Sequence, residues 1–155
     1  MYNTLSEANT YFSERLNSEP WDSASNTDRT KALIMASRAI DRLNFVGDKI
    51  GSAEFPRKFT ILIDGEEVVV EDEVVPENIK YAECEIALCL LSEYDVNLEA
   101  DNSNVEQSTF GPMTMRSNVS FMPQHFANGI VSATAWQYLK PYLRDPVCIR
   151  INRVN

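Results

Sequence analysis

The chain has 155 residues, a mass of 17.6 kDa and a formal net charge of −9, and hydrophobic residues make up 44% of it. This length fits one ordinary domain, and this hydrophobic fraction excludes a disordered polypeptide. No apolar run is long enough to cross a bilayer, and the N-terminus does not resemble a signal peptide. We therefore expect a protein made in a cytoplasm, without a membrane partner.

The charge is unevenly distributed along the chain. Residues 1–63 hold equal numbers of acidic and basic residues, residues 64–101 have a net charge of −12, and residues 102–155 have +3. This pattern indicates subunits that meet head to flank, or a C-terminal segment that binds an acidic partner. A solvated acidic surface explains the central segment about as well. This charge distribution is unsuited to binding a phosphate backbone, because such binding requires clustered Lys and Arg.

A first helix is predicted to begin at the capping box formed by Thr4 and Glu7. One face of it would carry Leu5, Ala8, Phe12 and Leu16. Residues 17–20 should end this helix, and Trp21 should follow in a loop. A buried anchor in the core is the favoured role of Trp21, and an intersubunit contact is the alternative.

A second helix is predicted after the N-terminal signature at residues 25–28. Its apolar stripe consists of Ala32, Leu33, Ala36, Ala39, Ile40 and Leu43. The alanines in this stripe permit close packing of helices. Gly47 and Gly51 mark the point where the chain leaves this helix.

A β-hairpin is predicted for residues 59–70, because Asp64-Gly65 separates two runs rich in Ile and Val. A hairpin alone is marginally stable in water. It must therefore lie on the helices of its own chain or on a neighbouring subunit.

A third helix is predicted to open at Val75-Pro76-Glu77, because proline is tolerated in a first turn. Its broad apolar face consists of Ile79, Ala82, Ile86, Ala87, Leu90 and Leu91, which implies burial on two sides. Residues 95–104 are predicted to form a loop.

The rest of the domain is predicted to hold a hairpin or loop and a last helix. Gly111-Pro112 divides residues 105–121 into two short segments, of which 113–116 alternates as a strand would. Ser132 should cap a fourth helix that distorts or ends near Pro141. The apolar residues of this helix are Ala135, Trp136, Leu139 and Leu143.

The last nine residues, 147–155, alternate between apolar and polar side chains, as an exposed strand does. We expect this segment to add a strand to its own sheet or to another protein. The predicted fold is therefore mainly α: a domain over 1–146 with a bundle of about four helices and a hairpin insertion, followed by an extended C-terminal arm over 147–155.

Candidate catalytic and metal-binding residues are scarce. A structural role is favoured for the only histidine, His125, since a general base needs a positioned partner. Cys84, Cys89 and Cys148 have neither zinc-site nor disulfide spacing. The acidic run 71–73 lacks the ligand spacing of an EF-hand, and no phosphate-binding glycine motif is present. We therefore predict a protein that is not an enzyme, with no catalytic, cofactor-binding or metal site.

Basic residues in the N-terminal half are Arg29, Lys31, Arg38 and Arg42. They alternate with acids and are typical of an ordinary helix surface.

Several stretches resemble a phage family labelled DnaT-like single-stranded-DNA-binding protein, and their organisation is also similar to the head–tail adaptor, or head-completion, proteins of tailed phages. The stretches lie at 6–12, 21–22, 28–33, 36–43, 55–57, 75–76, 82–88, 127–130 and 139–143, so the likeness covers most of the chain. None of them is a catalytic motif.

The adaptor resemblance implies a virion structural protein in the head–tail neck: a ring of about twelve copies beneath the portal. Such a ring extends the DNA channel, joins the capsid to a tail or nozzle protein and takes part in genome ejection, while genomic DNA passes through without sequence-specific binding. The arm would dock on the portal protein through Val147, Ile149, Arg150, Ile151 and Arg153. The acidic residues facing the channel or a neighbouring subunit would be Glu66, Glu67, Glu71, Asp72 and Glu73.

Two other functions stay open. The DnaT-like label implies a single-stranded-DNA-binding replication accessory protein, which a salt-dependent DNA titration would distinguish from an adaptor. A small-molecule enzyme would need a pocket with perturbed titrating groups.

Overall fold

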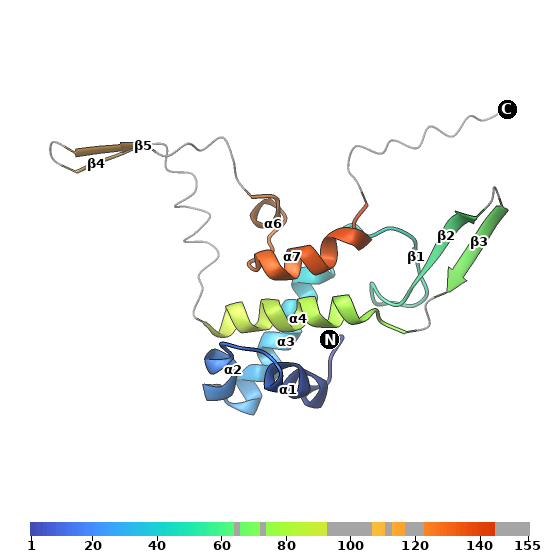
Figure 1. The fold of residues 1–155 in the computed structure, drawn as a ribbon, viewed down its shortest axis with the longest axis horizontal. Coiled ribbons are helices and arrows are strands. Elements are labelled where there is room, and N and C mark those ends of the chain that lie inside the picture. Colours follow the sequence, from blue (N-terminus) through green and yellow to red (C-terminus); the bar gives the residue numbers. More distant parts are fainter. Residues whose placement is uncertain (64–65, 72–73, 93–106, 111–112, 117–122, 145–155) are drawn as a thin grey trace.

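A computed structural model describes residues 1–63, 66–71, 74–92, 107–110, 113–116 and 123–144 (Figure 1). The fold is mainly helical with antiparallel hairpins, which confirms the predicted fold class. The helices are α1 (Leu5–Ser13), α2 (Glu19–Ser23), α3 (Asn26–Ile40), α4 (Glu77–Leu91), α6 (Gln124–Ala127) and α7 (Ala133–Leu139), followed by the 3-10 turn η1 (Lys140–Tyr142). The strands are β1 (Asp48–Lys49), β2 (Arg57–Ile63) and β3 (Glu66–Glu71) in one sheet, and β4 (Gln107–Phe110) and β5 (Met113–Arg116) in another.

Helix α4 is the centre of the helical body. It packs against α3 on one side and α7 on the other, and α1 and α2 also contact it (Figure 1). Its apolar residues Ile79, Ala82 and Ile86 are almost completely buried, so the predicted burial on two sides is confirmed. On α3, Ala32 and Ala36 are buried, and such small side chains allow helices to approach closely.

The capping box of α1 is confirmed, with Thr4 and Glu7 each accepting a hydrogen bond from the other's backbone. The prediction that Leu16 continues the apolar face of this helix is wrong. Helix α1 ends at Ser13, and Leu16 is 85% exposed. The chain reverses at Asn17, which adopts a φ of 58°, a left-handed conformation that asparagine tolerates better than most residues.

Trp21 lies in the short helix α2 and not in the predicted loop. Pro20 occupies the first turn of this helix, where its fixed φ is compatible with helical backbone. The predicted core role is confirmed, because Trp21 is buried and stacks on Phe12 with ring centroids 4.3 Å apart. Its indole Nε1 donates to Asn9 Oδ1 at 3.0 Å, so the one polar atom of the ring is satisfied.

Helix α7 closes the helical body. Ser132 caps it by accepting from the Ala135 amide at 3.1 Å, and Pro141 lies in η1 just beyond its end, both as predicted. The short helix α6 was not predicted. Beyond η1, residues 142–144 run beside residues 44–46 and exchange backbone hydrogen bonds of 2.9 Å with them.

Strands β2 and β3 form the predicted antiparallel hairpin, with Ile63 opposite Glu66, and the Asp64-Gly65 turn itself lies outside the described residues. The sequence did not predict β1, which adds a short third strand beside β2. Strands β4 and β5 pair around residues 111–112, which confirms the hairpin alternative for this region. In Figure 1 the β2–β3 hairpin extends away from the helical body. For residues 59–71 and 107–116 the description concerns the backbone.

The predicted loop 95–104 and the arm 147–155 lie outside the described residues. In the part of the chain that the structure describes, the helices are too short or too polar to cross a membrane.

Candidate functional site

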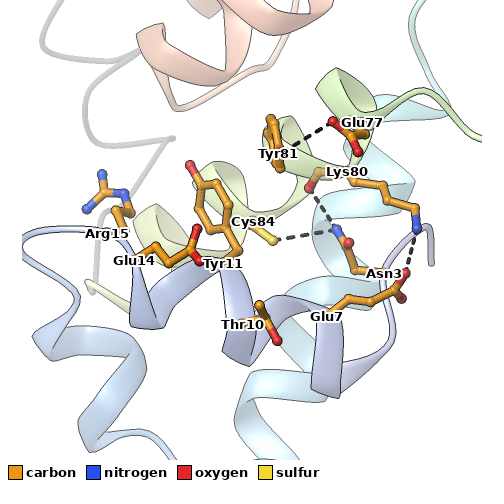
Figure 2. Close-up of a pocket in the computed structure, with 10 residues that line it drawn as sticks. All are labelled: Asn3, Glu7, Thr10, Tyr11, Glu14, Arg15, Glu77, Lys80, Tyr81 and Cys84. Atoms are coloured by element: carbon orange, nitrogen blue, oxygen red, sulfur yellow. Dashed lines mark hydrogen bonds and ion pairs between the residues drawn. The ribbon is translucent and has the colours of Figure 1, made fainter.

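A pocket of about 530 Å³ lies between α1 and α4 (Figure 2). Two tyrosine rings line it: Tyr11 from α1 stacks on Tyr81 from α4 with centroids 5.3 Å apart. Tyr138, which is not among the lining residues, meets Tyr81 edge-on at 5.8 Å. The lining residues are Asn3, Glu7, Thr10, Tyr11, Glu14, Arg15, Glu77, Lys80, Tyr81 and Cys84.

Both cations of this pocket are already paired. Lys80 Nζ lies 2.6 Å from Glu7 Oε1, and its hydrogen bond, with those from Thr4, lowers the pKa of Glu7 to about 2. Arg15 donates to both carboxylate oxygens of Glu85, at 2.6 and 2.9 Å. The pocket therefore has little free positive charge to offer a phosphate group.

Glu83, a fully buried carboxylate beside the pocket, ties the N-terminus to α4. It accepts hydrogen bonds from the backbone amides of Tyr2 and Asn3, at 2.8 and 2.7 Å, and from the Asn3 side-chain amide at 3.0 Å. Burial raises the pKa of Glu83, and these three donors act in the opposite direction by stabilising the ionised form. All its bonds are internal, so its role is structural.

The pocket lacks an activated nucleophile among the side chains that line it. Burial raises the pKa of the Cys84 thiol far above its ordinary value, so the thiol stays protonated. Burial and a hydrogen bond to Glu85 likewise raise the pKa of Tyr11. These shifts hold both groups in their neutral, less reactive forms.

A second hollow, the α3–α4 groove, has different chemistry. It has a volume of about 240 Å³ and is lined by Met35, Arg38, Ala39, Arg42, Ile86, Leu90, Gly129 and Val131. Arg38 lies in the last turn of α3 and Arg42 in the turn just beyond its end, and both are exposed. Within the described part of the chain, neither guanidinium makes a hydrogen bond or ion pair. The groove thus combines free positive charge with apolar surface.

Sequence reasoning missed this groove, because it assigned Arg38 and Arg42 to an ordinary helix surface. The spacing of four residues, with the apolar Met35 on the same face, was the available signal. The floor is formed by Ile86 and Leu90 of α4 and by Val131, and no sequence pattern connects these residues with α3.

The negative charge of the chain lies outside the helical body. Residues 1–58, 74–92 and 123–144 contain eleven acidic and eleven basic residues, so their formal charge is zero. The surplus acids belong to residues 59–73 and 93–122. The chain's overall charge therefore does not describe the helical surface on which the α3–α4 groove lies.

The residues predicted to face neighbours or the portal lie in β3 or outside the described residues. Glu66, Glu67 and Glu71 belong to β3, whereas Asp72 and Glu73 lie outside the described residues. The predicted portal-docking residues also lie outside them: Val147, Ile149, Arg150, Ile151 and Arg153.

In the described ranges, the histidine and the cysteines form neither a disulfide nor a metal cluster. His125 is half-buried on α6, where burial lowers its pKa. Cys84 is buried and Cys89 half-buried, and both are free thiols. No group of three or more His, Cys, Asp or Glu side chains in the described ranges is placed to hold a metal ion.

These features define a small helical protein with an attached acidic hairpin and a cationic, partly apolar groove. The chain belongs to the family described as "Putative DnaT-like ssDNA binding protein", whose model matches residues 1–154. The predicted resemblance to this family is therefore confirmed, and the adaptor assignment stays a prediction. No curated protein and no solved structure matches the chain.

Proposed function

We propose that this chain is a structural adaptor of the head-to-tail connector of a tailed phage. In this role it forms a ring beneath the portal, extends the DNA channel and joins the capsid to the tail.

The observation that carries this proposal is the hairpin that extends from the helical body (Figure 1). Strand β1 pairs only with the first two residues of β2, and from Phe59 to Ile63 the described pairing of β2 is with β3 alone. A two-stranded hairpin is marginally stable in water and is stabilised by packing on another surface. In a ring, the neighbouring subunit supplies that surface.

The distribution of charge supports the same role. The helical body is neutral, and the surplus acids lie in the hairpin and in residues 93–122. Acidic segments facing a channel would repel the DNA backbone, so the genome would pass without being held.

A single-stranded-DNA-binding accessory protein is the second candidate. The family description favours it more directly than it favours the adaptor. Arg38 and Arg42 are cations that could contact phosphates.

Binding of single strands, however, combines free positive charge with exposed aromatic rings. In the described part of the chain, the free positive charge and the aromatic rings lie in different hollows. Tyr11 and Tyr81 lie in the pocket whose cations are paired, and the α3–α4 groove has no aromatic lining. This separation is why we place the DNA-binding function second.

The test mixes the full chain with the portal protein of the same phage and follows assembly by light scattering and electron microscopy. A parallel titration measures single-stranded DNA binding as a function of salt. The proposal expects rings on the portal and weak DNA binding. Normal virions made without the chain, or no portal binding together with tight DNA binding and a steep salt slope, would favour the second candidate.

A further inference from the structure

We infer that the α3–α4 groove receives a second copy of this chain, and that the part received is the acidic strand β3 of that copy. This inference deepens the proposed function and rests on it, because it specifies how neighbouring subunits of the ring meet.

The groove has the chemistry of an unfilled protein interface. Met35 at its edge is 54% exposed, and Ile86 and Leu90 supply an apolar floor. Arg38 and Arg42 add two guanidinium groups, and the described lining residues include no acid. Guanidinium groups form bidentate pairs with carboxylates and are enriched at protein interfaces.

Charge complementarity identifies the occupant. Strand β3 contains Glu66, Glu67 and Glu71 around three consecutive valines, so it offers both carboxylates and apolar side chains. Among the described strands it also lies at the edge of its sheet, since the order is β1-β2-β3. Several other basic residues of the helical body are already paired with acids: Lys31 with Asp28, Arg15 with Glu85 and Lys80 with Glu7.

The two surfaces lie toward opposite ends of α4. The hairpin joins the N-terminal end, because β3 ends at Glu71 and α4 begins at Glu77. The groove uses Ile86 and Leu90 from the C-terminal half of this helix, which at 1.5 Å per residue is about 20 Å long. A contact between hairpin and groove is therefore head-to-tail, and such contacts generate rings when the rotation between copies closes.

The experiment reverses the groove charges in R38E/R42E, and the control is K140E/R144E. The control also reverses two exposed cations four residues apart but leaves the groove intact. Sedimentation and light scattering, with and without the portal, measure self-association, and thermal unfolding verifies the fold. R38E/R42E should weaken self-association about tenfold or more, because like charges would face each other. The control should assemble as the wild type does.

A charge swap separates a specific contact from a general effect of charge. E66R/E67R should also assemble poorly, whereas an equimolar mixture of E66R/E67R and R38E/R42E should recover assembly. Wild-type assembly by R38E/R42E, or no recovery in the mixture, would overturn the inference while leaving the adaptor function standing. A wild-type chain that neither self-associates nor binds the portal would overturn both.

Discussion

Arg57 shows how a single buried cation organises an irregular stretch of chain. Its guanidinium donates to the backbone carbonyls of Phe45, Val46 and Gly47, at 3.2, 2.9 and 2.6 Å, and pairs with Glu54 at 2.7 Å. The five N–H groups of arginine have a fixed fork geometry that can serve several acceptors at once. One side chain therefore links three consecutive carbonyls of the connection between α3 and β2 to the start of β2.

Arg57→Lys should lower the free energy of unfolding by about 1–3 kcal/mol, because an ammonium group cannot reach all of these acceptors and leaves buried carbonyls unpaired. Chemical denaturation measures the change. Arg144→Lys, at an exposed position, is the control and should have almost no effect. An unchanged denaturation midpoint for Arg57→Lys would show that other donors satisfy these backbone carbonyls.

Glu7 should make the free energy of unfolding depend on pH in the acidic range. Its pKa is about 2 in the folded chain and 4.5 ordinarily, with the hydrogen bond from Lys80 as the largest cause. A lowered folded pKa stabilises the protein above pH 4.5, and this contribution is lost as the pH falls toward 2. Glu7→Gln keeps an acceptor for the capping box but removes the titration.

Denaturation profiles from pH 6 down to about 2 test this expectation. The stability difference between wild type and Glu7→Gln should shrink as the pH falls. A constant difference for Glu7→Gln would contradict the role of the Lys80 pair.

At the scale of elements, the contact between α3 and α4 depends on small side chains. Ala36 is completely buried where these two helices pack. Its methyl group keeps the helices close, and a well-packed interior accepts few extra methylene groups.

Ala36→Leu should therefore destabilise the fold by about 1–3 kcal/mol through overpacking. Met35→Leu is the matched control, since it alters the adjacent, exposed position without adding volume to the core. Thermal unfolding distinguishes them. Equal melting temperatures for Ala36→Leu and Met35→Leu would mean that α3 and α4 can move apart at little cost in free energy.

At the scale of the whole molecule, the described helical body closes on itself within residues 1–144. Residues 142–144 already exchange backbone hydrogen bonds with residues 44–46, and the described core lies within residues 1–144.

Deletion of 147–155 should therefore leave a folded chain that no longer docks on the portal. Circular dichroism would verify folding, and co-sedimentation with the portal would measure docking. If the truncated chain unfolds, the last strand belongs to the domain's own sheet. If it folds and still docks, the portal contact lies elsewhere.

Local sequence patterns by themselves determined most of the elements. Several of these patterns act over only a few residues and can be identified directly in the sequence. They are the capping box at Thr4, the apolar stripe of α3, the Asp64-Gly65 signal between β2 and β3, and the cap at Ser132. The wrong predictions lie where more than one local structure fits the same stretch of sequence. The face of α1 was extended to Leu16, and the helix around Trp21 was assigned to a loop.

Only the tertiary structure decided what the polar residues of the helices do. Glu85 meets Arg15 across 70 residues, and Glu83 meets the N-terminus across about 80. The α3–α4 groove likewise needs α3, α4 and residues 129–131 together. Helix and turn propensities depend on neighbours in sequence, whereas burial, ion pairing and hollows depend on which distant segments pack together.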